Sequence, residues 1–277
     1  MALLLVILAG TAAALIVFFK IPYSKTKAEF RRIADKYLSK PSIPNETFTS
    51  EDWKLLPSPV RKYFETSGFT GKPKMSSMKA EFNQVDFILS PRKPAISIKY
   101  TQYNFVQPPA RIALIETAIY GIPFQGLDSY VAGIGSMKGV LGKTFTLFNQ
   151  LGEEMDQASL VTFLSESLWV PNAIIQDYIT WVPIDDHHVQ ATISCYGITA
   201  SGIFSFNDQG ECQSFTTDDR TAIGMDGSKQ RVRWSALMKD YKWIDGIRQP
   251  THLQAVWHYD SGDLVYFDSR NLRVEYR

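Results

Sequence analysis

Residues 78–83 read MKAEFN, and apolar and polar side chains alternate along them. The same alternation recurs in residues 189–196 (VQATISCY) and 272–277 (LRVEYR). Because side chains of a β-strand point alternately to its two faces, the pattern predicts strands with one buried and one wet face. Such strands, joined by turn signals such as residues 207–210 (NDQG), are typical of an antiparallel sheet.

One helical stretch interrupts the predicted strands. Residues 153–169 carry leucine and phenylalanine at helical spacing, and Pro171 follows them. A shorter helix is predicted at 60–66, after the start signal Ser58-Pro59. Strands, a helix and further strands predict an α+β domain, built on a mainly antiparallel curved sheet or half-open β-barrel with an internal helix.

Residues 1–19 contain no charged side chain. A helix of this length reaches about 28 Å, close to the ~30 Å hydrocarbon core of a bilayer. A cleaved signal peptide would carry a basic start, a shorter apolar stretch and a small-residue cleavage site, and the pattern around residues 19–23 does not fit one. We therefore expect a single-pass transmembrane helix in the cell membrane, with residues 1–19 contacting the lipid bilayer.

Basic residues follow this segment and none precedes it: Lys20, Lys25, Lys27, Arg31, Arg32 and Lys36. The positive-inside rule favours a cytoplasmic domain. Residues 24–38 have the pattern of an amphipathic helix, which either lies on an anionic leaflet or packs on the domain. The predicted organisation is an anchor at 1–19, a basic juxtamembrane helix and linker at 20–48, and one α+β domain at 49–277.

Composition excludes several classes of protein. The 277 residues are 45% hydrophobic and 21% charged, which excludes disordered and collagen-like chains. The formal charge of +1 argues against a nucleic-acid partner, whose binding needs a basic excess. Two cysteines are too few for a disulfide framework or a four-thiolate zinc site.

The stretch 133–144 (GIGSMKGVLGKT) ends like a phosphate-binding loop. That loop needs a glycine where Met137 stands, and it needs a helix to follow, whereas residues 145–148 (FTLF) favour a strand. The alternative prediction is a glycine-rich bend between strands, where the backbone passes close to another element.

No catalytic or metal-binding set emerges from the other reactive side chains. In a regular strand His252 and His258 lie about 20 Å apart, too far to share an ion. The adjacent His187 and His188 read as turn residues, and Cys195 reads as a small core residue. We therefore predict no catalytic residue, no metal ligand and no cofactor.

Aromatic residues are abundant, with 6 Trp, 13 Tyr and 17 Phe. In strands around a helix, they either line an apolar cavity or fill the core. In the first case we expect Trp169, Trp181 and Trp257 to line the cavity, with Arg220 near its mouth to meet an acidic group of the ligand.

Short strings in a fixed order resemble a family of uncharacterised, mostly bacterial, membrane-anchored proteins, known only as a domain of unknown function. The strings cover nearly all of the chain after the linker: Leu56-Pro57-x-Pro59-Val60-Arg61-Lys62-Tyr63, Tyr130-x-x-Gly133-x-Gly135-x-Met137, Leu164-x-Glu166-x-x-Trp169-x-Pro171-x-Ala173, Trp181, Asp219-Arg220, Tyr241 with Gly246, Pro250-Thr251 and Trp257. This resemblance supplies no catalytic residues.

The predicted architecture is also similar to the half-open barrels of lipoprotein-localisation carriers. That similarity implies an apolar cavity for acyl chains. It also implies that the domain lies outside the cytoplasm, which conflicts with the orientation that the positive-inside rule favours. The leading hypothesis is a module that binds a lipid or other apolar ligand. The alternatives are a membrane-tethered interaction or scaffold protein with a filled core, and an unrecognised hydrolase. A cavity of roughly several hundred Å³ would favour binding.

Overall fold

The computed structural model describes residues 1–40, 46–89, 93–224 and 227–277. Its strands are β1 (Ser77–Phe87), β2 (Ile96–Phe105), β3 (Ala110–Ile119), β4 (Ile122–Val131), β5 (Ile134–Leu141), β6 (Phe145–Gln150), β7 (Ile179–Pro183), β8 (His188–Cys195), β9 (Ile198–Phe206), β10 (Cys212–Thr217), β11 (Thr221–Ile223), β12 (Lys229–Arg231), β13 (Arg233–Ile244), β14 (Ile247–Tyr259) and β15 (Gly262–Tyr276). Its helices are α1 (Ala2–Lys20), α2 (Lys25–Leu38), α3 (Ser50–Trp53), α4 (Ser58–Thr66), α5 (Glu153–Ser165) and α6 (Pro171–Ile174), with a 3₁₀ turn at Ser167–Trp169.

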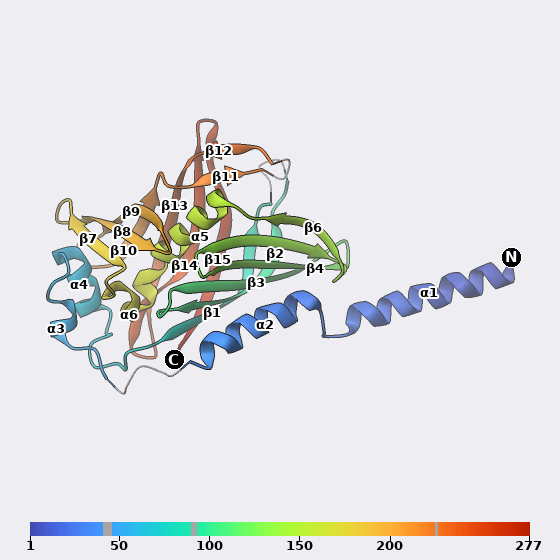
Figure 1. Cartoon of the computed structure of the whole chain (residues 1–277), viewed down its shortest axis with the longest axis horizontal. Coiled ribbons are helices and arrows are strands. Elements are labelled where there is room, and N and C mark those ends of the chain that lie inside the picture. Colours follow the sequence, from blue (N-terminus) through green and yellow to red (C-terminus); the bar gives the residue numbers. More distant parts are fainter. Residues whose placement is uncertain (41–45, 90–92, 225–226) are drawn as a thin grey trace.

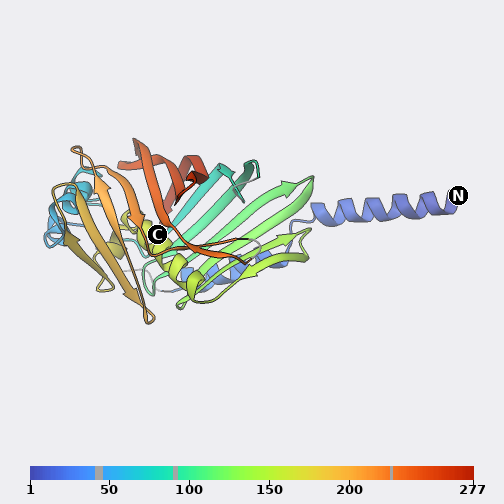
Figure 2. The same cartoon turned by 90° about the horizontal axis from the view of Figure 1, so that it is seen from above.

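Thirteen of these strands form one antiparallel sheet in the order β6-β5-β4-β3-β2-β1-β15-β14-β13-β10-β9-β8-β7. The sheet curves into two arms, with β7 to β10 on one side and β2 to β6 on the other (Figure 2). Within the described residues, the edge strands β6 and β7 do not pair, so the sheet does not close into a barrel. The expected α+β class with a curved antiparallel sheet is confirmed.

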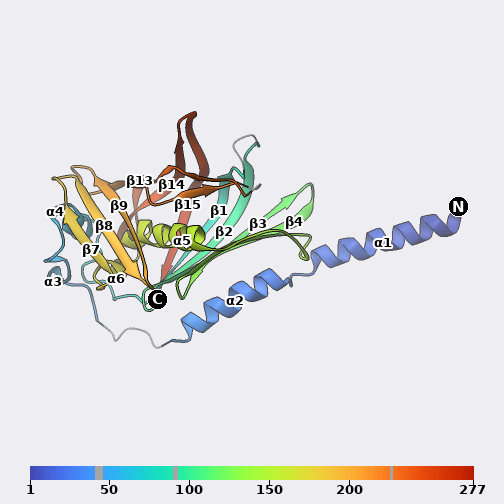
Figure 3. The same cartoon turned by 45° about the horizontal axis from the view of Figure 1, so that its top comes forward.

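Helix α5 connects the two edge strands and lies inside the curve of the sheet, against β5 and β9 (Figure 3). The predicted helix at 153–169 is thus α5 followed by the 3₁₀ turn. Its apolar residues, among them Leu160, Phe163 and Leu164, are buried in the main core. The expected internal helix is therefore present on the concave face.

Helix α2 covers the outer face of β3 and β4. Its Phe30 and Tyr37 pack with Ile112 and Leu114 of β3, while Ala113 of the same strand faces the main core. Because β3 is buried on both faces, it reads as an apolar run rather than an alternation. Of the two roles left open for this amphipathic helix, packing on the domain is the one that the fold shows.

Helix α1 extends away from the domain along its longest axis (Figure 1). It is the one helix of the described residues long and apolar enough to cross a membrane, and none of its apolar window is buried. Residues 41–45 of the predicted linker lie outside the described residues.

The glycine-rich stretch 133–144 is not a bend. It forms strand β5 with a turn at each end. The close approach that was expected is present: a β-carbon at Gly135 would lie 2.2 Å from the carbonyl oxygen of Met155 in α5. The Gly135 amide also donates to Asp156 Oδ1 at 2.7 Å. Glycine at this position therefore allows α5 to pack closely against β5. The sequence pattern, which is typical of a turn, did not predict this contact.

Candidate functional site

A cavity of about 130 Å³ lies on the concave face, between the carboxyl end of α5 and strands β1, β2 and β13 to β15. Seven of the twenty described residues that line it are aromatic: Phe82, Phe87, Tyr100, Trp169, Trp234, Tyr266 and Phe267. Several of these rings contact one another edge to face, including Tyr100 and Phe267 at 5.4 Å. Aromatic rings in mutual contact therefore make much of the wall apolar, which is usual for a small-molecule site.

The polar floor of the cavity is centred on Arg111 of β3, which is 3% exposed. Its Nε donates to Glu166 at 2.9 Å and its Nη1 donates to Asp128 at 2.7 Å. Its Nη2 donates to the Tyr100 hydroxyl at 2.6 Å. Burial by itself lowers the pKa of Arg111, but the facing carboxylates outweigh burial and raise that pKa well above its ordinary value. Arg111 is therefore a permanent buried cation, balanced by its own partners.

Glu166 is the acceptor that joins this floor to the helix. It follows α5 directly, and besides Arg111 it accepts from Gln102 Nε2 at 2.7 Å and from Asn104 Nδ2 at 2.8 Å. Both amides belong to β2, so the carboxylate joins β2 and β3 to the end of α5. All three of these hydrogen bonds end on Glu166 Oε2, and such a network of buried polar groups supports a structural role for this carboxylate.

Arg220 also lines the cavity but has different surroundings. Its guanidinium lies over the ring of Trp234 at 4.4 Å and over that of Trp257 at 5.2 Å. The carboxylates beside it in sequence are used elsewhere, since Asp218 pairs with Arg233 and Asp219 pairs with Arg231. Among the described residues, Arg220 Nε is buried without a hydrogen-bond partner.

Trp169 contributes a second buried donor without an acceptor. The residue is 9% exposed, and within the described part of the chain its indole Nε1 has no hydrogen-bond partner. Leaving a buried donor unpaired costs roughly 1–3 kcal/mol, so such groups are rare in folded proteins. Two of them, Arg220 Nε and Trp169 Nε1, belong to residues that line the same cavity.

The four residues expected to form the site are only partly brought together. Trp169 and Arg220 line the cavity, and Trp257 lies behind Arg220 and stacks on Tyr266. Trp181 is elsewhere: it packs on Phe204, and its indole donates to the Ile174 carbonyl at 3.2 Å.

Sequence reasoning missed Arg111 and Glu166. The available signals were a lone charge inside the apolar run 110–115 (ARIALI) and a glutamate within the motif around Trp169.

The histidines and cysteines do not converge on this cavity. His252 pairs with Asp268 at 2.8 Å, whereas His258 pairs with Asp263 at another position of the sheet. No group of three metal-binding side chains occurs in the described ranges. Burial raises the pKa of both Cys195 and Cys212, so each is a protonated thiol at neutral pH.

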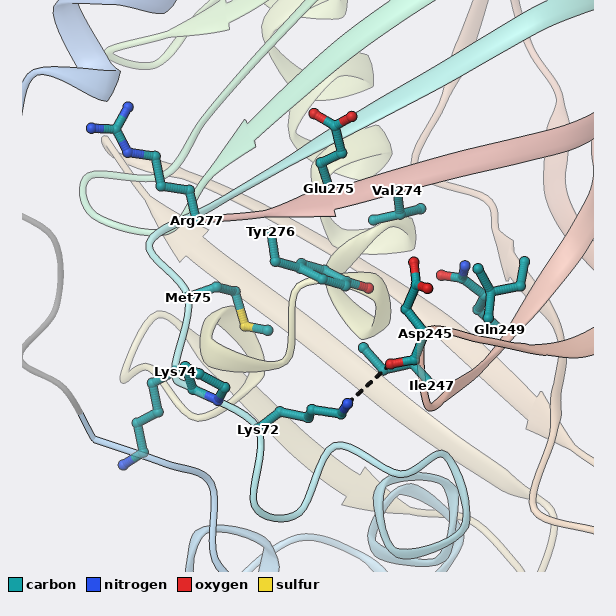
Figure 4. Close-up of a pocket in the computed structure, with 12 residues that line it drawn as sticks. Lys72, Lys74, Met75, Asp245, Ile247, Gln249, Val274, Glu275, Tyr276 and Arg277 are labelled. Carbon is teal, nitrogen blue, oxygen red and sulfur yellow. Dashed lines mark hydrogen bonds between the residues drawn. The ribbon is translucent and has the colours of Figure 1, made fainter.

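A larger cavity of about 400 Å³ lies at the β13–β14 turn, outside the concave site (Figure 4). Lys72 Nζ donates there to the Asp245 carbonyl at 3.0 Å. Lys74 and Arg277 point away from the other side chains in this view, and Lys74 pairs with Asp52 at 2.8 Å. This groove has no buried donor left unpaired among the described residues, which distinguishes it from the concave cavity.

Residues 46–269 match the family of unknown function DUF6544. The chain belongs to this family. The predicted resemblance to a domain of unknown function is thereby confirmed, and the DUF6544 match covers the whole sheet except the last residues of β15. No curated protein matches the chain.

Several solved structures are similar to this DUF6544 protein. One is a domain named for outer membrane lipoprotein sorting, from Vibrio parahaemolyticus, with 8% identity, a TM-score of 0.42, and coverage of 78% of this chain and 91% of that one. A LolA superfamily protein from Nitrosomonas europaea has 11% identity, a TM-score of 0.40, and coverage of 79% and 93%. A DUF1329 family protein from Desulfovibrio piger has 10% identity, a TM-score of 0.33, and coverage of 83% and 94%.

Proposed function

We propose that this DUF6544 protein is a membrane-anchored module that binds an apolar ligand with an anionic end in the concave cavity. One observation carries the proposal: two residues that line an aromatic cavity, Arg220 and Trp169, each have a buried N–H donor that lacks an acceptor within the described residues. A carboxylate or phosphate oxygen would satisfy them, and a guanidinium matches such groups in charge and geometry.

The position of Arg220 supports this role. The rings of Trp234 and Trp257 hold its guanidinium by cation–π contact and exclude water from one face. Asp218 and Asp219 are engaged by other arginines, and no ion pair of Arg220 occurs among the described residues, so its charge would be available to a ligand. The aromatic wall beside it would receive an alkyl chain.

The volume limits what the cavity takes. At about 130 Å³, it is close to the roughly 150 Å³ of an apolar cavity that holds benzene, and smaller than pockets that enclose a whole lipid. The ligand is therefore held by its head and the first part of one chain. The volume is also below the roughly several hundred Å³ expected of a binding cavity, which favours a second candidate, an interaction protein whose core is filled by its own aromatics.

Membrane anchoring is the other half of the proposal. Helix α1 has a mean hydropathy of 2.8 in its apolar window, and either an anchor or a signal sequence fits such a helix. Retention is supported by the domain itself, since Lys143 Nζ donates to the carbonyls of Phe18 and Ile21 at 2.6 and 2.5 Å.

Binding is tested on the full chain in nanodiscs, first by native mass spectrometry with lipid extraction. Titrations with oleate and with methyl oleate then separate recognition of the head from burial of the chain. We expect Arg220→Gln to weaken oleate binding about tenfold or more, the value of a charged hydrogen bond, and to leave methyl oleate unchanged. Arg273→Gln, at an exposed arginine paired with Glu275, is the matched control.

Three outcomes separate the candidates. Tight oleate binding that depends on Arg220 supports the proposal. If oleate and methyl oleate bind equally well, both to the native chain and to Arg220→Gln, the cavity does not recognise an anionic group and is a purely apolar site. No copurified lipid, together with no binding of either probe, overturns ligand binding and favours the filled-core interaction protein.

A further inference from the structure

Two β-hairpin tips carry exposed apolar side chains beside the end of α1. Tyr120 lies at the β3–β4 turn and is fully exposed, at 100%, and Phe145 follows the β5–β6 turn and is 66% exposed. Ile122 and Leu147, the next outward residues of these hairpins, are also exposed. We call these four residues the tip patch. Figures 1 and 3 both place these hairpin ends toward α1.

The tip patch is continuous with the last turn of α1. A β-carbon at Gly142 would lie 3.5 Å from the ring of Phe19 and 3.7 Å from Ile122. At the neighbouring position Lys143 holds the Phe18 carbonyl, and its ammonium lies 5.2 Å from the Phe18 ring. The hairpin tips and the end of the apolar helix therefore sit at the same level.

This level has the composition of a membrane interface. Tyrosine and other aromatics concentrate where hydrocarbon meets headgroups, and lysines reach from there to the lipid phosphates. Here Tyr120 and Phe145 are accompanied by the exposed Lys20, while Lys143 is buried and holds the end of α1. Contiguous exposed apolar groups on a soluble surface usually mark a contact site.

We infer that the tip patch inserts into the headgroup layer of the same bilayer that α1 spans, as a second membrane contact. The inference rests on the proposed anchor, not on the proposed ligand. The two contacts would fix the orientation of the domain on the membrane. One end of strands β3 to β6 would contact the bilayer, and edge strand β7 would lie on the side of the domain away from it (Figure 1).

The test uses the full chain in vesicles of phosphatidylethanolamine and phosphatidylglycerol. A spin label is attached at Phe145→Cys and, as the control, at Val182→Cys, since Val182 is 57% exposed on β7. The unsubstituted chain gives the background from Cys195 and Cys212. We expect the label at 145 to collide with oxygen more than with a water-soluble nickel reagent, and the label at 182 to do the reverse. Tyr120→Cys is a second position if Phe145→Cys does not fold.

Each outcome has a separate meaning. Interfacial depth at 145 or 120, with an aqueous label at 182, supports the tip patch. Equal aqueous exposure of all labels, in a chain that resists carbonate extraction, overturns the tip patch and leaves the anchor standing. Release of the chain by carbonate overturns both.

Discussion

Arg111 is a buried cation whose partners come from three elements. Removing the charge of Glu166 leaves Arg111 with one carboxylate, Asp128, which is the more exposed of the two. Breaking a buried ion pair costs roughly 3–5 kcal/mol, because an uncompensated charge remains inside. We expect Glu166→Gln to lower the free energy of unfolding by about 3 kcal/mol, measured by urea denaturation.

The control for this prediction is Asp218→Asn. It breaks the pair with Arg233, in which both side chains are more than half exposed, and exposed pairs contribute at most about 1 kcal/mol. Similar losses in the two variants would contradict the view that burial makes the Arg111 network costly to break.

Asp268 gives the protein a specific acid sensitivity. Burial raises its pKa, but hydrogen bonds from Gln254 and His252 outweigh burial, and the net pKa is below the ordinary value of 3.8. Since the folded pKa is the lower one, this carboxylate stabilises the fold above pH 3.8, and the stabilisation is lost as the pH falls through the folded pKa. Asp268→Asn should be less stable at pH 7 and lose less stability between about pH 5 and 2.

Chemical denaturation across that pH range measures the effect. Asp177→Asn, at an exposed carboxylate, is the control and should keep the native pH profile. A native profile in Asp268→Asn would show that its hydrogen bonds contribute nothing.

Sequence could indicate the residues of the cavity but not their partners. The abundant tryptophans and Arg220 led to the hypothesis of an aromatic cavity with a cation near its mouth, beside the alternative of a filled core. Trp169 and Arg220 do line the same cavity, whereas Trp181 lies elsewhere. The Arg111 network was not predictable, because Asp128 and Glu166 lie 17 and 55 residues away. Asp128 meets Arg111 through the pairing of β3 with β4, and Glu166 meets it through the packing of α5 inside the sheet.

At the scale of elements, β5 and α5 pack closely because Gly135 has no side chain. A β-carbon at Gly135 would lie 2.2 Å from a backbone oxygen of α5, whereas one at Gly139 would meet only the ring of Phe148, 2.4 Å away on edge strand β6. A ring on an edge strand can move, but a helix backbone cannot. We expect Gly135→Ala to destabilise the fold by about 2–3 kcal/mol and Gly139→Ala by less than about 1 kcal/mol.

Thermal and urea unfolding of the two variants check this difference. Equal effects would mean that α5 shifts away from β5 without cost. The same glycines explain why sequence failed here: glycine is unfavourable in strands, so a stretch rich in it indicates a turn unless the packed helix is known. The strands with clean alternation, β1, β8 and β15, were predictable because one of their faces is wet.

At the scale of the whole molecule, α1 and the domain are nearly independent. None of the apolar window of α1 is buried, and its contacts with the domain centre on Gly142 and Lys143. Deleting residues 2–20 should therefore shift the midpoint of thermal unfolding by less than about 2–4 °C, the effect of 1 kcal/mol in a domain of this size. A drop of about 10 °C would show that α1 belongs to the folded core.

The side of the membrane is also a property of the whole chain. The basic residues after α1, such as Lys25, Arg31 and Arg32, favour a cytoplasmic domain. A reporter fused after Arg277 should then be active only when the reporter works in the cytoplasm. Activity of an extracytoplasmic reporter would show that positive charge does not orient this protein.

The order of the sheet could not be predicted at this scale. The first and last strands of the domain, β1 and β15, are neighbours at its centre, and the two edges are joined through α5. Periodicity reports which face of a strand is buried, but it carries no information on which strand lies beside it.

An open sheet has consequences that a closed barrel would avoid. Among the described residues, no strand pairs with the outer edge of β6 (FTLFNQ), and β6 carries neither a charge nor a proline to repel another strand. The opposite edge, β7, ends in Pro183. In the absence of a bilayer, two copies can therefore pair through their β6 edges and form one continuous sheet. We expect such dimers to become more abundant as the protein concentration rises, measured by sedimentation velocity, and Thr146→Lys should prevent them.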